Sequence, residues 1–260
     1  MVGKICVVTG SNKGLGLEIV KQLVANSETE KVYGLCRRSS PSLDELAAAA
    51  SSNKKLLVVP NIDVSKDDVA TKLQEVFGTT PIDVLIHNAG ASGPPEKFDT
   101  DAAMFESQSL TNITMDRMRF TFELNTLGPL RVTQALLPNI KAAATTVTGK
   151  PAKVIIISSS AGSIASVESG GLYSYRTSKA AVNMVGANLA KDLKPHNIAV
   201  GLIHPGTVFT GILNTRTQYH RDVDVSVKGV LQTITDDITL DNTGVYLDAT
   251  YGEGAKPISW

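Results

Sequence analysis

The sequence has few cysteines, no excess of charge of one sign and no long hydrophobic run. Its two cysteines, Cys6 and Cys36, both lie inside short apolar segments. Cysteine in such a segment is usually a small buried side chain. We therefore expect neither a disulfide framework nor a cysteine-based metal site.

The charge balance argues against two large classes of partner. Lys and Arg together number 25, and Asp and Glu together also number 25, so the formal net charge is zero. Such a chain has no general attraction for phosphate backbones or anionic lipid, and no apolar run is long enough to span a bilayer. We expect no nucleic-acid partner and no membrane. The first residues lack the pattern of a secretory signal, which predicts a cytoplasmic location.

Strand-like and helix-like segments alternate along the 260 residues, and 42% of these residues are hydrophobic. The expected strands are Lys4–Val8, Val32–Cys36, Leu56–Val59, Val84–His87, Val154–Ser158, Ile198–Ile203 and Val245–Asp248. The expected helices are Leu15–Val24, Asp67–Phe77, Met115–Ile140 and Tyr175–Leu193. This pattern predicts one α/β domain over residues 1–260, a Rossmann-like doubly wound parallel sheet of about seven strands with helices on both faces.

Two segments lack this regularity and are candidate ligand-binding loops. They are Ala91–Thr114, rich in Gly, Pro and Asp, and Thr207–Val225, which mixes Thr, Asn, Arg and Tyr. Both follow expected strands, where α/β proteins place their binding loops.

Three glycines join the first expected strand to the first expected helix. Gly10 would permit a tight turn, Gly14 would let backbone N–H groups approach a pyrophosphate, and Gly16 would let the helix pack closely. The alternative is an ordinary strand-to-helix turn, which the βαβ context disfavours.

The spacing T-G-x-x-x-G-x-G resembles the short-chain dehydrogenase/reductase family. Further landmarks of that family follow in the expected order, namely Asp63, Val64, Asn88, Ala89, Gly90, Asn125, Ser159, Tyr175, Lys179, Pro205 and Gly206. The resemblance implies that Asp63 holds the adenine amino group, that Val64 packs near it, and that Asn88, Ala89 and Gly90 stabilise the sheet beside the adenosine ribose.

The resemblance also implies a nicotinamide dinucleotide, NADP(H), as cofactor. The residues expected to bind it are Gly10, Asn12, Lys13, Gly14, Leu15, Gly16, Arg37, Asp63, Val64, Asn88, Ala89, Gly90, Tyr175, Lys179, Pro205, Gly206, Val208 and Thr210. Cys36 stands where an NAD-binding protein would have an acid. The cations of Lys13 and Arg37 suit a 2′-phosphate instead. The alternative is that Arg37 and Arg38 are simply solvated.

The catalytic residues are expected around Tyr175. Lys179 follows it by four residues, so both lie on one helix face, and the ammonium favours the phenolate. Tyr175 is the expected proton donor, and Ser159 would hydrogen-bond the substrate oxygen, with Ser158 and Ser160 as alternatives. By the resemblance, Asn125 links Lys179 to solvent through water.

No metal is expected in this site. His87 and His204 flank apolar strands without a second ligand at metal spacing, so we interpret them as buried, hydrogen-bonded histidines.

Within the family, the segment from Tyr173 to Met184 and the C-terminal residues look like the C-factor and sniffer branch, which is related to carbonyl reductases. This resemblance implies a small carbonyl or alcohol substrate (an aldehyde, ketone or quinone) and a homodimer or homotetramer. The alternative function is a non-catalytic NADP(H)-binding signalling or sensor protein. The sequence contains Ser159, Tyr175 and Lys179 as well as the glycine loop, and this combination favours an enzyme.

Overall fold

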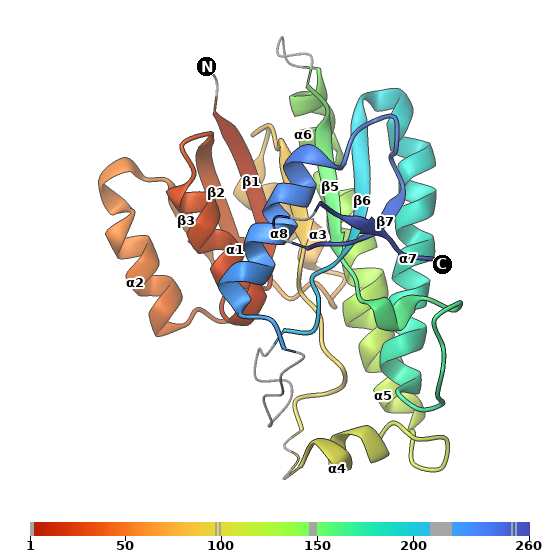
Figure 1. Ribbon diagram of the computed structural model, residues 1–260. Coiled ribbons are helices and arrows are strands. Elements are labelled where there is room, and N and C mark those ends of the chain that lie inside the picture. Colours follow the sequence, from red (N-terminus) through yellow and green to blue (C-terminus); the bar gives the residue numbers. More distant parts are fainter. Residues whose placement is uncertain are drawn as a thin grey trace.

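An eight-stranded sheet forms the centre of the fold, and helices cover both of its faces (Figure 1). The structure is a computed structural model that describes residues 3–96, 98, 100–145, 150–208, 220–250, 252 and 254–260. The strand order is β3-β2-β1-β4-β5-β6-β7-β8. The strands are β1 (Lys4–Thr9), β2 (Thr29–Leu35), β3 (Leu56–Val59), β4 (Val84–His87), β5 (Ala152–Ile157), β6 (Ile198–His204), β7 (Val245–Asp248) and β8 (Lys256–Pro257).

The predicted fold class is confirmed, with one strand more than expected. The seven predicted strands pair in parallel, and β8 adds to β7 in the antiparallel direction. The sequence did not indicate β8, because a two-residue strand carries no periodicity. The order reverses between β1 and β4, which is where an open α/β sheet forms its ligand crevice.

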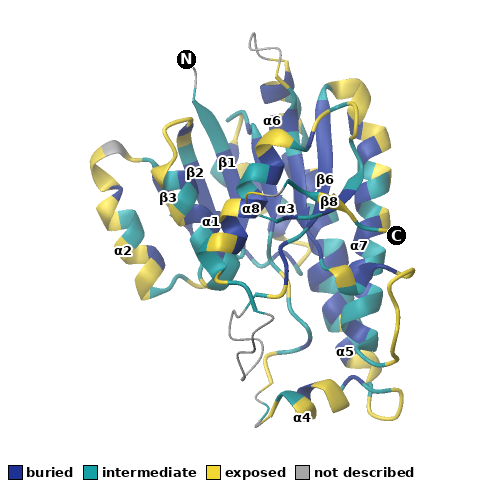
Figure 2. Ribbon diagram, viewed as in Figure 1, coloured by how far each residue is buried: buried dark blue, intermediate teal, exposed yellow. Residues whose placement is uncertain are grey.

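Along the central strands, alternate side chains pack into two separate hydrophobic cores, as expected for strands buried on both faces of the sheet. On β1, Val7 points to one core while Cys6 and Val8 point to the other. Figure 2 shows these strands as buried between partly exposed helices. Cys6 and Cys36 are both buried and free, as predicted.

The helices divide between the two faces. Those whose buried residues join Cys6 and Val8 are α1 (Gly14–Ala25), α2 (Pro41–Ala49) and α8 (Val223–Asp236). Those whose buried residues join Val7 are α3 (Val69–Phe77), α6 (Gly128–Ala144) and α7 (Tyr173–Leu193). The structure also contains the short 3-10 turns η1 (Ser51–Asn53), η3 (Ser160–Gly162) and η4 (Lys194–His196).

Two helices lie partly or wholly in the segments predicted to be irregular. Helix α4 (Asp101–Glu106) falls inside Ala91–Thr114, and α8 begins inside Thr207–Val225. The expected helix Met115–Ile140 is also more complex than predicted. It consists of α5 (Met115–Phe122), a π turn η2 (Glu123–Leu127) and α6. Single π turns within helices are frequent at functional sites.

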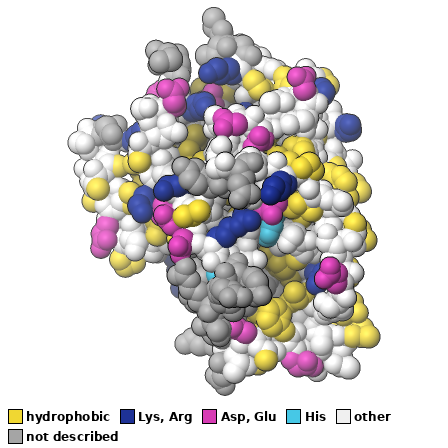
Figure 3. All heavy atoms as spheres, in the orientation of Figure 1, with side chains coloured by type: hydrophobic (Ala, Val, Ile, Leu, Met, Phe, Trp, Pro, Cys, Tyr) yellow, Lys and Arg dark blue, Asp and Glu magenta, His cyan; other side chains and the backbone are white. Residues whose placement is uncertain are grey.

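The surface carries no block of one charge on the face shown in Figure 3, where Lys and Arg alternate with Asp and Glu. Within the described part of the chain, no helix combines the length and apolarity needed for a membrane span.

Candidate active site at the carboxyl edge of the sheet

The loop after β1 is packed too tightly for side chains at two of its glycines. Gly10 has φ +69°, and a Cβ there would lie 2.8 Å from Cα of Ala89. A Cβ on Gly16 would lie 2.1 Å from the carbonyl oxygen of Gly10. Helix α1 therefore begins directly against the loop, and its first N–H groups face the place where a dinucleotide pyrophosphate would lie. This cradle fits the expected cofactor.

The ends of β1 and β4 are bonded to each other through Asn88 and Thr9. The Asn88 amide donates to the carbonyl oxygens of Thr9 (3.0 Å) and Gly10 (3.1 Å). The Thr9 hydroxyl accepts from the main-chain N–H groups of Asn88 and Ala89, each at 3.0 Å. These bonds fix the position of the glycine loop beside Gly90.

The residues that directly follow β2 are Cys36, Arg37 and Arg38, so the position expected for an NAD-binding acid holds a cysteine. Cys36 is buried there, and burial raises the pKa of its thiol despite a hydrogen bond with Ser11. Arg37 and Lys13 are both exposed near this edge, and Lys13 is the residue that precedes α1. The carbonyl of Asn12 accepts a 2.7 Å hydrogen bond from Ser40, the N-cap of α2.

Asp63 follows β3 and is partly buried. Burial opposes its ionisation, but hydrogen bonds from Ser65 and the nearby charge of Arg37 outweigh this effect and lower the pKa of Asp63. A charged acceptor is thus available at this edge. Val64 is buried against Gly128 at the start of α6.

Tyr175, Lys179 and Ser159 come together at the junction of β5 and α7. The hydroxyl of Ser159 lies beside the phenol of Tyr175, where it favours the phenolate. The Nζ of Lys179 lies 5.8 Å from the centre of the Tyr175 ring and donates a 2.9 Å hydrogen bond to the carbonyl of Ile157. Gly162 allows this close packing, because a Cβ there would lie 2.8 Å from the main-chain carbon of Lys179.

Burial disfavours the charged forms of both Lys179 and Tyr175. Burial lowers the pKa of Lys179 to about 8. Burial raises the pKa of Tyr175, and the hydroxyl of Ser159 beside it acts in the opposite direction. A positive charge on Lys179 further favours the phenolate, since opposite charges stabilise each other in a poorly solvated site.

The three consecutive serines lie in different environments. Ser158 is buried and donates a 2.5 Å hydrogen bond to Oδ1 of Asn183. Ser160 is exposed, in η3. Ser159 is therefore the serine that the structure brings to Tyr175.

Asn125 lies within the π turn and is buried. Its Oδ1 accepts from the N–H of Ala91 (2.9 Å), and its Nδ2 donates to the carbonyl of Ala91 (2.8 Å) and to Ser178 Oγ (2.9 Å). A Cβ on Gly90 would lie 3.2 Å from Asn125 Oδ1 and 3.6 Å from Lys179 Nζ, so both side chains converge on Gly90. Asn125 thus fixes the loop after β4 against α7. Ser178 was not predicted as a site residue, although it immediately precedes Lys179.

The segment after β6 completes this edge of the sheet. Pro205 and Gly206 are buried, and the carbonyl of Pro205 accepts a 2.7 Å hydrogen bond from Ser226 of α8. Val208 pairs with Arg221 in an isolated bridge. Thr210, the remaining expected cofactor residue, lies outside the described residues.

The two histidines differ from each other. His87 is buried and hydrogen-bonded to Thr133 Oγ1 at 2.8 Å, and burial lowers its pKa to about 3. The prediction for His204 was wrong in part, because His204 is only partly buried and its Nδ1 has no partner among the described residues. The described part of the chain contains no cluster of three His, Cys, Asp or Glu side chains able to hold a metal.

Comparison with known proteins identifies the family. The family model for short chain dehydrogenases matches residues 4–221, which is most of the chain. The chain belongs to this family. A 1-hydroxy-2-glutathionyl-2-methyl-3-butene dehydrogenase from Rhodococcus sp. (strain AD45) is 31% identical to this short-chain dehydrogenase over 244 residues, or 92% of this chain and 93% of that protein.

Further relatives place this short-chain dehydrogenase in the C-factor and sniffer-like branch. C-signal from Myxococcus xanthus is 35% identical over 170 residues, covering 65% of this chain and 90% of that protein. The NADPH-bound carbonyl reductase from chicken fatty liver superposes with a TM-score of 0.82 at 30% identity, and Carbonyl reductase Sniffer of D. melanogaster with 0.81 at 27%. Both structural alignments cover 100% of each chain.

Proposed function

We propose that the protein is an NADPH-dependent oxidoreductase that reduces a small carbonyl substrate to an alcohol, or runs the reverse reaction. The observation that carries the proposal is the placement of Ser159 beside the phenol of Tyr175, with the Nζ of Lys179 5.8 Å from the centre of the Tyr175 ring. A phenol, a hydroxyl and an ammonium in this arrangement can protonate a carbonyl oxygen as charge develops on it.

NADP(H) is the proposed cofactor, held along the edge from the glycine loop to Pro205. Two features support binding of a 2′-phosphate at the end of β2. Lys13 and Arg37 are cations there, and the position that holds an acid in NAD-binding proteins holds Cys36 in this chain. The similar carbonyl reductase from chicken is NADPH-bound, which supports the same choice. Asp63 and Val64 would hold the adenine, and Gly10, Asn12, Gly14, Leu15 and Gly16 the pyrophosphate.

In the proposed reaction, the chemistry that a bound NADPH would supply is transfer of a hydride to the carbonyl carbon. The phenol of Tyr175 donates its proton to the carbonyl oxygen, and the product is an alcohol. Ser159 donates a hydrogen bond to the same oxygen, where negative charge develops. Lys179 stabilises the Tyr175 phenolate that remains, and Asn125 holds the neighbouring loop in place through Ala91.

The substrate class proposed is small aldehydes, ketones and quinones. The test follows the decrease in NADPH absorbance with a panel drawn from these three groups and purified protein. We expect saturable turnover with at least one compound, and turnover of that compound slowed by roughly 10²–10⁴-fold in Tyr175→Phe. Failure of the whole panel, in both directions of the reaction, would contradict the carbonyl reductase proposal.

A second candidate is a signalling protein that binds NADP(H) without turnover, and similarity to C-signal favours it. The intact set of Ser159, Tyr175 and Lys179 supports the enzyme instead, since cofactor binding alone does not need a proton-donating phenol beside Ser159. NADPH binding without turnover in the panel would favour the second candidate.

We also propose a homo-oligomer assembled through the helical faces of Met115–Ile140 and Tyr175–Leu193. Met115 and Met184 expose 57% and 65% of their surface on these segments, which supports a covered face. A monomer mass in light scattering at micromolar concentration would contradict the oligomer. The cytoplasmic location stays a prediction.

A further inference from the structure

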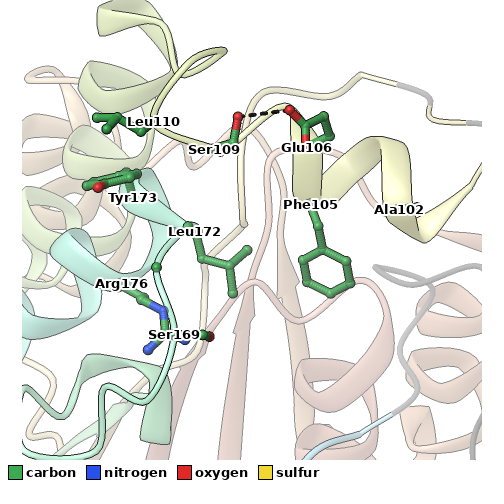
Figure 4. Close-up of a pocket in the computed structure, with 11 residues that line it drawn as sticks. Ala102, Phe105, Glu106, Ser109, Leu110, Ser169, Leu172, Tyr173 and Arg176 are labelled. Carbon is green, nitrogen blue, oxygen red and sulfur yellow. Dashed lines mark hydrogen bonds between the residues drawn. The ribbon is translucent and has the colours of Figure 1, made fainter.

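A cavity of about 790 Å³ lies between α4 and the first turn of α7, and Figure 4 shows its lining. We call it the α4–α7 cavity. One side of its lining includes Phe105 and Glu106, and the other includes Leu110, Leu172 and Arg176. None of the proposed catalytic residues lines it. Its volume is in the range that holds a small organic ligand.

One donor group of the lining has no acceptor. The Nε of Arg176 is buried and has no hydrogen-bond partner within the described ranges. A buried donor without an acceptor is unfavourable, which indicates that an acceptor belongs there.

The N-terminus of α7 adds to this positive character. The helix has 21 residues, its N-cap Leu172 makes no side-chain cap, and its first turn holds no acid. The N–H groups and the dipole at such an end favour an anion. Arg176 lies in the same turn, where a cation is unfavourable unless an anion accompanies it.

The acid in the lining does not balance these donors. Glu106 accepts hydrogen bonds from Ser109 Oγ at 3.1 Å and from Asn112 Nδ2 at 2.6 Å. Both bonds go to Oε1 of Glu106. The described residues show no ion pair between Glu106 and Arg176, so Arg176 is available to pair with an anionic ligand.

The rest of the lining is largely apolar. Phe105 and Leu110 expose 44% and 74% of their surface, and in Figure 4 Phe105 and Leu172 extend into the space between the two walls. Exposed apolar side chains around one charged group suit a ligand with a hydrocarbon body and a single anionic end.

We propose that the α4–α7 cavity binds an amphipathic monocarboxylate. The carboxylate pairs with Arg176 at the N-terminal turn of α7, and the hydrocarbon part lies against Phe105, Leu110 and Leu172. A guanidinium suits this role, because it forms charge-assisted hydrogen bonds to a carboxylate in a fixed geometry. The site is separate from Tyr175 and needs no turnover.

Isothermal titration calorimetry with decanoate tests the site on the full chain. We expect saturable binding to the wild type, weakened roughly tenfold or more in Arg176→Met, since a charge-assisted bond is lost. Arg119→Met is the matched control, because Arg119 lies on α5, is exposed and pairs with Asp116. Its decanoate affinity should equal that of the wild type. Decanol, which lacks the charge, should bind the wild type more weakly than decanoate.

Two further variants distinguish binding in the α4–α7 cavity from binding in the catalytic site. Phe105→Ala should weaken decanoate and decanol alike, and Ser159→Ala should change neither. An affinity for decanoate that falls in Ser159→Ala would place the ligand in the catalytic site and overturn the proposal. Unchanged affinity in Arg176→Met would also overturn it. NADPH titration of each variant verifies that it is folded.

The competing occupant is a second copy of the chain. In that case decanoate would not bind, and Leu110→Glu would convert an oligomer to a monomer in light scattering. That result would overturn the carboxylate site while leaving the carbonyl reductase proposal intact, since turnover is measured separately.

Discussion

The phenol of Tyr246 on β7 donates a hydrogen bond to the main-chain carbonyl of Ser159, 87 residues away in the sequence. Burial raises the pKa of Tyr246 to about 12, so the phenol remains a donor at neutral pH. The Tyr246 ring packs on Trp260 with their centres 5.5 Å apart, and the carbonyl of Trp260 accepts a 2.9 Å hydrogen bond from Ala165. The C-terminal residues thus support the segment that carries Ser159.

From this contact we predict that Tyr246→Phe lowers kcat roughly tenfold, because the Ser159 carbonyl loses its donor and the serine loses its fixed position. NADPH affinity should stay the same. Kinetics with the best panel substrate measure the effect, and Tyr33→Phe, a buried tyrosine on β2, is the control. If Tyr246→Phe lowers the melting temperature but leaves kcat unchanged, Tyr246 supports the fold alone.

The proton donor can be distinguished from its neighbour in the same helical turn. Tyr175 contacts Ser159, whereas Tyr173 lines the α4–α7 cavity. Tyr175→Phe should slow reduction by roughly 10²–10⁴-fold with little change in NADPH binding, as expected when acid catalysis is lost. Tyr173→Phe should be far milder. Turnover that survives in Tyr175→Phe and collapses in Tyr173→Phe would reverse the assignment.

Cofactor preference should depend on the residue that follows Cys36. We predict that the wild type binds NADPH roughly tenfold or more tightly than NADH, and that Arg37→Asp reverses this order, because an acid repels the 2′-phosphate and accepts from the ribose hydroxyl. Fluorescence titration measures both affinities. Arg38→Asp is the matched control and should have a smaller effect. Equal affinity of the wild type for both cofactors would mean that Arg37 is only a solvated residue.

Stability should fall in acid partly because of His87. Burial lowers its pKa to about 3 in the folded protein. Below its ordinary pKa of about 6.5, the unfolded chain binds a proton there that the folded protein does not, so folding becomes less favourable as pH falls from about 6.5 towards 3. Each such group contributes up to about 1.4 kcal/mol per pH unit to this loss.

We therefore expect His87→Gln, whose amide can still bond Thr133, to lose less stability than the wild type between about pH 7 and about pH 4.5. Urea unfolding at several pH values measures the slope. His196→Gln, at an exposed position in η4, is the control. Parallel slopes for wild type and His87→Gln would show that other groups determine the acid sensitivity. His204, whose pKa burial lowers to about 4, would then be the next candidate.

The features that could be predicted from the sequence are those that neighbouring residues determine. Continuous apolar runs identified the buried strands, and the spacing of Gly10 and Gly16 identified a tight loop, because both features act on neighbouring residues. Helix α8 was missed because its apolar residues are mostly β-branched valines within a polar segment. The bond from Tyr246 to Ser159 depends on the sheet bringing β7 beside β6, so no sequence spacing could indicate it.

The π turn at Glu123–Leu127 has a consequence for how this protein can be altered. A π turn completes one revolution with about one residue more than an α-helical turn. The extra residue is taken up within Glu123–Leu127, so Thr121 of α5 still faces Ser174 while Val132 of α6 still faces the core. Deleting one residue there would restore a regular helix and keep both of these faces, but it would remove the widened turn in which Asn125 lies. Shortening this segment by one residue is therefore expected to damage the site and to spare the core.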